Sequence, residues 1–325
     1  MYRGLIGLLV VASLLVGCGG DAPVVLPTAV PAPVAGTGAA PLLGSPLPLS
    51  PGAADLARPV LASSNLVVGA NRFVFGLLDA QTGQPIPDVP QTQLQFFKVH
   101  DDGTATKTGD ATVVYQNENL PAGLFVAHTE FDTAGSWGAL LTVQRQGRAA
   151  YTVPLNFKVL ADSPIPGVGA FAPRSHNLTL RDVRDVAEID SAVPHDTMHN
   201  LTIAEAVKSG KPTVILFGTP GFCESRMCGP DLAVAQALQQ KYAAQANFIH
   251  IETPSHTHLQ PVAPEHYTTG GHAGVARPQI ATMQEWGLQT EPWIFLVDRA
   301  GVVAAAFEGG LTLQEVEPAF VPLLP

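Results

Sequence analysis

One stretch decides how this chain is interpreted: Thr213-Val-Ile-Leu-Phe-Gly-Thr-Pro-Gly-Phe-Cys223-Glu-Ser-Arg-Met-Cys228-Gly-Pro-Asp-Leu-Ala-Val-Ala-Gln-Ala-Leu238. Its apolar, β-branched start at residues 214–217 predicts a buried strand, and residues 233–242 predict a helix. Two cysteines lie in the turn between them. Unpaired backbone N–H groups and the positive end of a helix dipole favour a thiolate at such a turn. The stretch therefore predicts thiol–disulfide chemistry.

The spacing of Cys223 and Cys228 limits how they can pair. On a regular α-helix, residues five apart have Cα atoms about 8–9 Å apart, beyond the limit of about 7 Å for a disulfide. A disulfide therefore needs a loop between the two cysteines, and Pro230 favours a helix that begins near it. The alternative is a helix that begins near Glu224 and is kinked by Pro230, which leaves the thiols apart. We favour the loop.

The amino terminus resembles an export signal. Arg3 precedes an apolar run at residues 4–16 that is too short to span a bilayer. The segment Leu14-Leu15-Val16-Gly17-Cys18 resembles a bacterial lipobox, which implies that residues 1–18 are a lipoprotein signal peptide and that Cys18 carries the lipid. The alternative is a buried cysteine in an ordinary signal peptide.

The cysteine count agrees with an exported protein. The chain has three cysteines, so a lipidated Cys18 leaves only Cys223 and Cys228, in a compartment where disulfides persist. We therefore expect an extracytoplasmic protein that is anchored to the cell membrane by its N-terminal lipid. The net charge of −10 argues against nucleic acid as a partner.

The 325 residues allow two domains after the signal peptide and linker. Residues 19–64 are rich in proline and alanine and predict a semi-rigid spacer. Residues 65–161 predict an all-β sandwich, because short strand-like runs recur between turn signals. The expected strands are 72–78, 93–99, 111–116, 123–131, 136–144 and 150–159.

One short piece of the sandwich resembles a known family. The sequence Phe131-Asp-Thr-Ala-Gly135-Ser-Trp137 resembles the turn-to-strand corner of bacterial immunoglobulin-like domains. The resemblance implies an immunoglobulin-like domain. Because the sequence of this region shows no catalytic chemistry, we expect it to be a spacer or docking module, and a simple folded stalk is the alternative. Residues 162–190 are again rich in proline and glycine and predict a second linker.

Residues 191–325 predict an α/β domain. The predicted elements are a helix at 201–208, the strand and helix around the cysteines, a strand at 247–251, a helix at 279–286, strands at 293–297 and 302–307, and a helix from 312. Strand, helix, strand, helix, two strands and helix is the element order of the thioredoxin fold.

The residues themselves resemble the thioredoxin-like superfamily, and within it the exported TlpA-type thiol–disulfide oxidoreductases. The resemblance is carried by residues 211–238 and by Trp286-Gly-Leu-Gln-Thr-Glu-Pro292-Trp-Ile-Phe-Leu-Val-Asp298-Arg-Ala-Gly301. It implies that Cys223 is the attacking thiolate, that Cys228 is the resolving thiol, and that Pro292 is a cis-proline against the sulfurs. Glu291 is a candidate proton acceptor for Cys228, and a solvated surface carboxylate is the alternative.

The sequence also departs from this family. Its Cys-x-x-Cys is opened to Cys-x4-Cys, and Glu291 stands where an uncharged residue is usual. Glu224 beside Cys223 disfavours a thiolate, whereas Arg226 favours one.

We expect the protein to be a thiol–disulfide oxidoreductase without a cofactor, acting on exported protein thiols and disulfides. A first alternative is a copper-binding protein, similar to thioredoxin-fold copper chaperones, that uses Cys223, Cys228 and His250. Further loop histidines are candidates for the same role: His256, His258, His266 and His272. A second alternative is a non-catalytic lipoprotein whose two cysteines form a structural disulfide.

Overall fold

The computed structural model describes residues 57–86, 91–147, 149–223, 225–253 and 276–325. The expected signal peptide with its lipobox, the first 38 residues of the linker (19–56), Glu224 and the four later loop histidines lie outside the described residues. Within the described part of the chain, no helix is long and apolar enough to cross a membrane.

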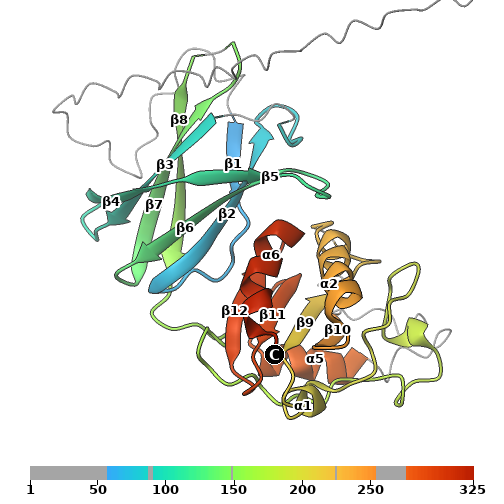
Figure 1. Cartoon of the computed structure of the whole chain (residues 1–325). Coiled ribbons are helices and arrows are strands. Elements are labelled where there is room, and N and C mark those ends of the chain that lie inside the picture. The colour runs from blue at the N-terminus through green and yellow to red at the C-terminus, as the bar shows by residue number, and fades with distance from the viewer. Residues whose placement is uncertain (1–56, 87–90, 148, 224, 254–275) are drawn as a thin grey trace, which may run out of the picture. The chain divides into compact units, whose positions relative to one another are not determined.

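The first domain is a sandwich of two antiparallel four-stranded sheets (Figure 1). One sheet has the order β1 (Ala57–Leu61), β2 (Gly69–Asp79), β6 (Leu124–Phe131), β5 (Val113–Gln116). The other has the order β4 (Ala105–Ala111), β3 (Gln91–Val99), β7 (Gly135–Gln144), β8 (Tyr151–Val159). The all-β prediction for this region is therefore confirmed.

Aromatic side chains from both sheets fill the sandwich core. Phe73 of β2 lies 5.1 Å, centroid to centroid, from both Phe96 of β3 and Phe157 of β8. Trp137 of β7 is buried against Phe131, and its indole N–H donates to the carbonyl of Thr133 at 2.9 Å. Large rings that bury their area between two sheets are a main source of stability in such a domain.

Two strands of the sandwich were not expected. β1 lies inside the segment that we assigned to the linker, and β4 precedes the expected strand at 111–116. Both are edge strands, which need only one hydrogen-bonded neighbour. An edge tolerates Pro59 in β1, and it tolerates the polar sequence of β4, which shows no apolar alternation.

The second domain is built on one mixed sheet with the order β10 (Asn247–Glu252), β9 (Thr213–Gly218), β11 (Trp293–Val297), β12 (Val303–Glu308). β10 runs parallel to β9, whereas β11 runs antiparallel to both β9 and β12. The helical elements are η2 (Val186–Glu188), α1 (Ile203–Ala206), α2 (Cys228–Tyr242), α5 (Ala276–Glu285), α6 (Leu313–Phe320) and η4 (Val321–Leu323). This element order is the thioredoxin-like order that the sequence predicted.

The central strand β9 is buried along its whole length because both faces of the sheet are covered. Val214 and Leu216 pack in a core with residues of α2 and α6. Ile215 and Phe217 face the opposite core, which contains Trp286 and residues of α1. In open α/β sheets, reactive groups gather beyond the carboxyl ends of such strands. In this domain, that end is Gly218 and the turn that follows it.

The segment that we expected to be a second linker packs on this domain. Ile165 and Ala172 belong to the same buried cluster as β9, and Phe171 forms a β-bridge with Val302. The glycines and prolines of this segment suggested a loose connection, but its backbone is hydrogen-bonded to the β12 region, as where Gly169 donates to Val303 at 2.9 Å.

Candidate functional site

A disulfide joins Cys223 and Cys228 at the carboxyl end of β9, with their Cα atoms 6.0 Å apart. Helix α2 begins at Cys228, so Cys223 and residues 225–227 lie before the helix. This is the loop arrangement that we favoured over a kinked helix. Arg226 within the loop has φ +60°, a left-handed conformation that breaks any helix at this point.

The two sulfurs have different surroundings. Cys228 is fully buried, whereas Cys223 is partly exposed. The backbone N–H of Cys228 donates to Cys223 Sγ at 3.3 Å, and the hydroxyl of Ser225 lies 3.2 Å from the same sulfur. Cys223 is therefore the more accessible of the two sulfurs, and it accepts from a backbone N–H at the start of helix α2.

Gly218 brings the proline and the disulfide together. A Cβ atom on Gly218 would lie 3.5 Å from the Cβ atoms of both Cys228 and Pro292, and 3.7 Å from Cys228 Sγ. The Glu291–Pro292 peptide bond is cis. One carboxylate oxygen of Glu291 lies within 4.8 Å of both sulfurs. The structure thus brings the four residues singled out by the sequence into one site.

A buried carboxyl group that we did not predict lies one helical turn after Cys228. Asp231 is fully buried, and one of its oxygens accepts a hydrogen bond from the backbone N–H of Leu311 at 2.9 Å. Its other oxygen has no hydrogen-bond partner among the described residues. Burial raises the pKa of Asp231 to about 7. The hydrogen bond of this carboxyl group is with the backbone at Leu311, and the group of potential ligand atoms around the two sulfurs does not include it.

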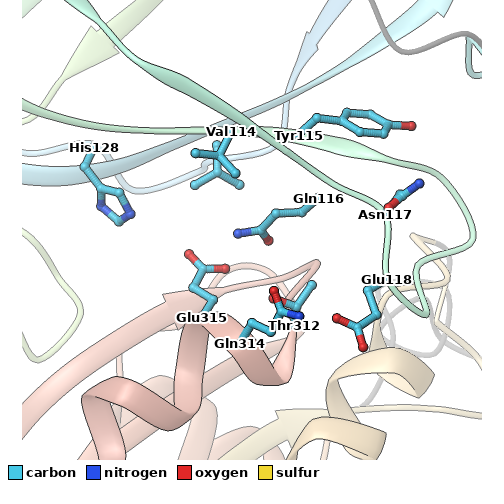
Figure 2. A pocket seen from close by; sticks show the side chains of 10 residues that line it. Val114, Tyr115, Gln116, Asn117, Glu118, His128, Thr312, Gln314 and Glu315 are labelled. Carbon is cyan, nitrogen blue, oxygen red and sulfur yellow. The ribbon is translucent and has the colours of Figure 1, made fainter. Parts of the chain in front are cut away.

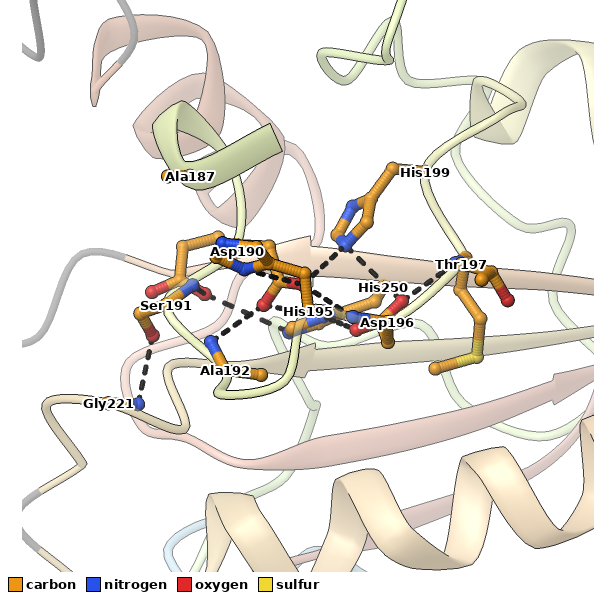
Figure 3. A network of polar contacts seen from close by, with 12 residues as sticks. Ala187, Asp190, Ser191, Ala192, His195, Asp196, Thr197, His199, Gly221 and His250 are labelled. Carbon is orange, nitrogen blue, oxygen red and sulfur yellow. Dashed lines mark hydrogen bonds and ion pairs between the residues drawn. The ribbon is translucent and has the colours of Figure 1, made fainter. Parts of the chain in front are cut away.

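A second cluster of chemically capable groups lies beneath the same strand end (Figure 3). Asp190, Asp196, His199 and His250 are all buried, and each offers a ligand atom within 4.8 Å of the others. His250 comes from β10, and the other three come from the segment before α1. The backbone N–H of His250 donates to the carbonyl of Met198 at 2.9 Å, which ties this segment to the edge of the sheet.

The polar contacts of the cluster lead to the disulfide turn. His250 Nδ1 lies 2.6 Å from Asp196 Oδ2, and its Nε2 lies 3.0 Å from the carbonyl oxygen of Gly218. Ser191, next to Asp190, accepts a hydrogen bond from the N–H of Gly221 at 2.9 Å, two residues before Cys223 (Figure 3).

Opposite charges dominate the electrostatics of this cluster. Burial opposes the charged form of His199, but the carboxylates of Asp190 and Asp196 outweigh it and raise the pKa of His199 to about 9. Burial likewise opposes ionisation of Asp190 and Asp196, but the histidines and backbone N–H groups hold the pKa of each carboxyl below its usual range. Burial raises the pKa of Glu252, which lies 4.0 Å from His250 Nε2.

The placement of His250 bears on the copper hypothesis. Within the described residues, the group of potential metal ligands around the two sulfurs contains Glu291, and His250 belongs to the cluster with the aspartates. Sequence reasoning missed that cluster because its members are separated by 60 residues and follow no common ligand spacing. The only sequence signal was the local set Asp190, Asp196 and His199 just before the fold.

A pocket elsewhere in the described residues is not part of this site. Figure 2 shows its lining of polar and apolar side chains, among them Gln116, Glu118, His128, Gln314 and Glu315. Neither cysteine lines it. We therefore assign it no role in the thiol chemistry.

Comparisons with known proteins give distant similarities. No protein-family model and no curated protein matches the chain. Among solved structures, the chain is similar to a thioredoxin family thiol:disulfide interchange protein from Chlorobium tepidum TLS, at 15% identity, covering 50% of this chain and 99% of that one, with a TM-score of 0.28.

Two other solved structures are similar over about a third of the chain. One is CopC from Methylosinus trichosporium OB3b, at 10% identity, covering 32% of this chain and 95% of that one, with a TM-score of 0.20. The other is a DUF4426 family protein from Pseudomonas aeruginosa PAO1, at 13% identity, covering 29% of this chain and 76% of that one, with a TM-score of 0.23. At these scores the similarities decide neither fold nor function. The chain's own strand order and connections give an antiparallel β region followed by a region with the thioredoxin-like element order.

Proposed function

We propose that this protein is an extracytoplasmic thiol–disulfide oxidoreductase of the TlpA type, anchored to the membrane by lipid on Cys18, which exchanges disulfides with exported proteins. The observation that carries the proposal is the asymmetry of the disulfide. Cys223 is partly exposed, and its sulfur accepts a hydrogen bond from the backbone N–H of Cys228. Cys228 itself is fully buried. A partner protein can therefore reach one sulfur and not the other.

The reaction takes place in two exchange steps. In the reduced protein, the Cys223 thiolate attacks one sulfur of a substrate disulfide, which forms a mixed disulfide and releases the other substrate sulfur as a thiolate. Cys228 then loses its proton and attacks Cys223 Sγ, which closes the disulfide and releases the second substrate thiolate. The substrate gains the two electrons that the cysteine pair loses. The reverse sequence oxidises a substrate dithiol.

The remaining site residues support these steps. Glu291 has a carboxylate oxygen within 4.8 Å of both sulfurs, so it is placed to accept the Cys228 proton. Pro292 borders the disulfide through its contact with Gly218, where we propose that the substrate strand lies. None of these roles requires a cofactor.

For the first domain we propose an immunoglobulin-like fold and the role of a spacer or docking module. Its strand orders, β1-β2-β6-β5 and β4-β3-β7-β8, correspond to the A-B-E-D and C′-C-F-G sheets of that fold. The proline-rich segment before it is long enough to hold the second domain away from the membrane surface.

Insulin reduction and thiol alkylation test the proposed activity. In a Cys18→Ser background, mild reduction is expected to make Cys223 alkylatable, with Cys228 reacting only after unfolding, and Cys223→Ser is expected to abolish insulin reduction. The proposal fails if neither thiol is alkylated after mild reduction, or if Cys223→Ser keeps full activity. Breaking the bridge lowers stability in either case, so a purely structural disulfide is distinguished by the absence of any exchange activity.

A further inference from the structure

We propose that Asp190, Asp196, His199 and His250 form a binding site for one divalent transition-metal ion, best suited to Zn²⁺, beneath the turn that carries the disulfide. These four residues are called the His–Asp cluster below. The site is separate from the two sulfurs and goes beyond the proposed exchange reaction. Two imidazole nitrogens and two carboxylates are a donor set that Zn²⁺ accepts in tetrahedral sites.

The histidine on β10 is oriented as a metal ligand. His250 Nε2 lies 3.0 Å from the carbonyl oxygen of Gly218, and a carbonyl can only accept, so this nitrogen carries the hydrogen. The other ring nitrogen, Nδ1, lies 2.6 Å from an oxygen of Asp196 and 4.0 Å from an oxygen of Asp190. In a filled site, the metal ion would replace the hydrogen that Nδ1 donates to the Asp196 carboxylate. A backbone carbonyl that fixes the tautomer of a ligating histidine in this way is a typical feature of metal sites.

The second histidine provides an independent reason to expect a ligand. His199 is 1% exposed, and its Nε2 makes no hydrogen bond among the described residues. That nitrogen points between the two carboxylates, 3.3 Å from Asp196 Oδ1 and 3.5 Å from Asp190 Oδ2 (Figure 3). The nitrogen is thus held by ion pairs without a well-aligned hydrogen bond, and a metal ion between the three groups would replace these ion pairs with coordinate bonds.

The spacing and the charge of the cluster also fit. Bonds of about 2.0–2.1 Å place the ligand atoms of a tetrahedral Zn²⁺ about 3.3 Å apart. His199 Nε2 lies 3.3 and 3.5 Å from one oxygen of each aspartate, which agrees with this value, whereas His250 Nδ1 lies 2.6 and 4.0 Å from the other oxygen of each aspartate. A single ion would therefore need small side-chain rotations that bring both histidines to its carboxylate ligands. Two carboxylates and one divalent cation cancel in charge when both imidazoles are neutral, so the buried site acquires no net charge.

The carboxylates are held in place by their own hydrogen bonds. Asp190 accepts from the backbone N–H groups of Ala192 and Asp196, each at 2.8 Å, and Asp196 accepts from Met198 at 2.7 Å. A filled site would therefore clamp residues 190–199 to β10. The hydroxyl oxygen of Ser191, in the same segment, accepts a hydrogen bond from the backbone N–H of Gly221. Residues 190–199 are therefore bonded to the turn that leads to Cys223.

Metal binding by a thiol-free variant of the full-length protein tests this inference. The Cys18→Ser, Cys223→Ser, Cys228→Ser variant removes every thiol, so that sulfur cannot bind the probe. After removal of metals with a chelator, Zn²⁺ binding is measured by calorimetry, and Co²⁺ is used to detect tetrahedral coordination by its intense visible absorption. The expected result is one ion per chain, tetrahedral for Co²⁺, with a higher thermal midpoint for the loaded protein.

Two substitutions locate the ion, and a third is the matched control. His199→Gln and Asp190→Asn remove one ligand atom each and are expected to weaken Zn²⁺ binding more than about tenfold. His195→Ala changes a partly exposed histidine in the same segment, 3.5 Å from Asp190 but outside the His–Asp cluster, and is expected to bind Zn²⁺ as before. Circular dichroism confirms that each variant is folded.

The inference is overturned by three results. The first is that the thiol-free protein binds no more Zn²⁺ than a nonspecific control protein, which would leave the cluster as an ion-pair network only. The second is that Zn²⁺ binding survives in the folded His199→Gln and Asp190→Asn variants. The third is that Zn²⁺ binding is lost in the His195→Ala control. Because the test protein has no cysteines, failure here leaves the proposed exchange activity untouched.

Discussion

Replacing Asp231 by asparagine should change how the stability of the thioredoxin-like domain depends on pH. The Asp231 carboxyl group is fully buried, and burial raises its pKa from 3.8 to about 7 in the folded protein. The folded state therefore binds more protons than the unfolded state between these two values. The contribution of the protonated Asp231 carboxyl group to stability is complete below about pH 4 and is lost as the pH rises through about 7.

The size of the effect follows from the shift. About three pKa units at about 1.4 kcal/mol each give roughly 4 kcal/mol of stability lost between about pH 4 and pH 8. Asparagine keeps an oxygen that can accept from the N–H of Leu311 and cannot ionise. The Asp231→Asn variant should therefore match the wild type near pH 4 and exceed its stability by a few kcal/mol near pH 8.

Urea unfolding of the oxidised protein, followed by the fluorescence of buried Trp286 and Trp293, measures this difference across the pH range. Asp162→Asn, at an exposed position just before this domain, is the matched control and should leave the pH profile unchanged. The reasoning is refuted if Asp231→Asn has the same pH profile as the wild type, or if it is less stable by the same amount at every pH.

Three further predictions follow from the site and its surroundings. The disulfide joins residues only five apart, so reducing it should lower the free energy of unfolding by about 2 kcal/mol. Urea titrations with and without reductant measure this difference, and an unchanged free energy of unfolding would contradict the prediction. Ser225→Ala removes the hydroxyl 3.2 Å from Cys223 Sγ and should slow alkylation of the reduced Cys223 about fivefold near neutral pH, whereas an equal rate would show that the hydroxyl does not support the thiolate. Gly287→Ala should cost more than about 2 kcal/mol in thermal or urea unfolding, because φ is +65° and the new Cβ would lie 2.1 Å from a backbone oxygen. The control Gly229→Ala, in α2 with open space, should be neutral or slightly stabilising, and an equal loss in both would contradict this reasoning.

The thioredoxin-like region could be predicted because its strands are buried on both faces. Residues 214–217 and 293–297 are short apolar runs bounded by turn residues, which is typical of strands buried on both faces. The order of these strands and the helices between them along the chain was enough to predict the thioredoxin-like arrangement. The cis peptide at Pro292 was expected only from the family resemblance, and the structure has it.

Other features depend on contacts that local sequence does not encode. The edge strands β1 and β4 show no apolar alternation, so their pairing partners decide their structure. Asp231 has the sequence context of an ordinary first-turn helix aspartate, and only the packing around it makes it buried. The His–Asp cluster joins residues 190–199 to His250 through the fold of the chain, which no spacing rule predicts.

The most direct test of the central claim is to trap the mixed disulfide. In a Cys18→Ser, Cys228→Ser protein incubated with insulin, the account predicts a covalent adduct through Cys223, because the resolving thiol that would release it is missing. The matched Cys18→Ser, Cys223→Ser protein, whose remaining sulfur is buried, should form little adduct. No adduct through Cys223, or an equal adduct through Cys228, would contradict the assignment of Cys223 as the attacking thiol.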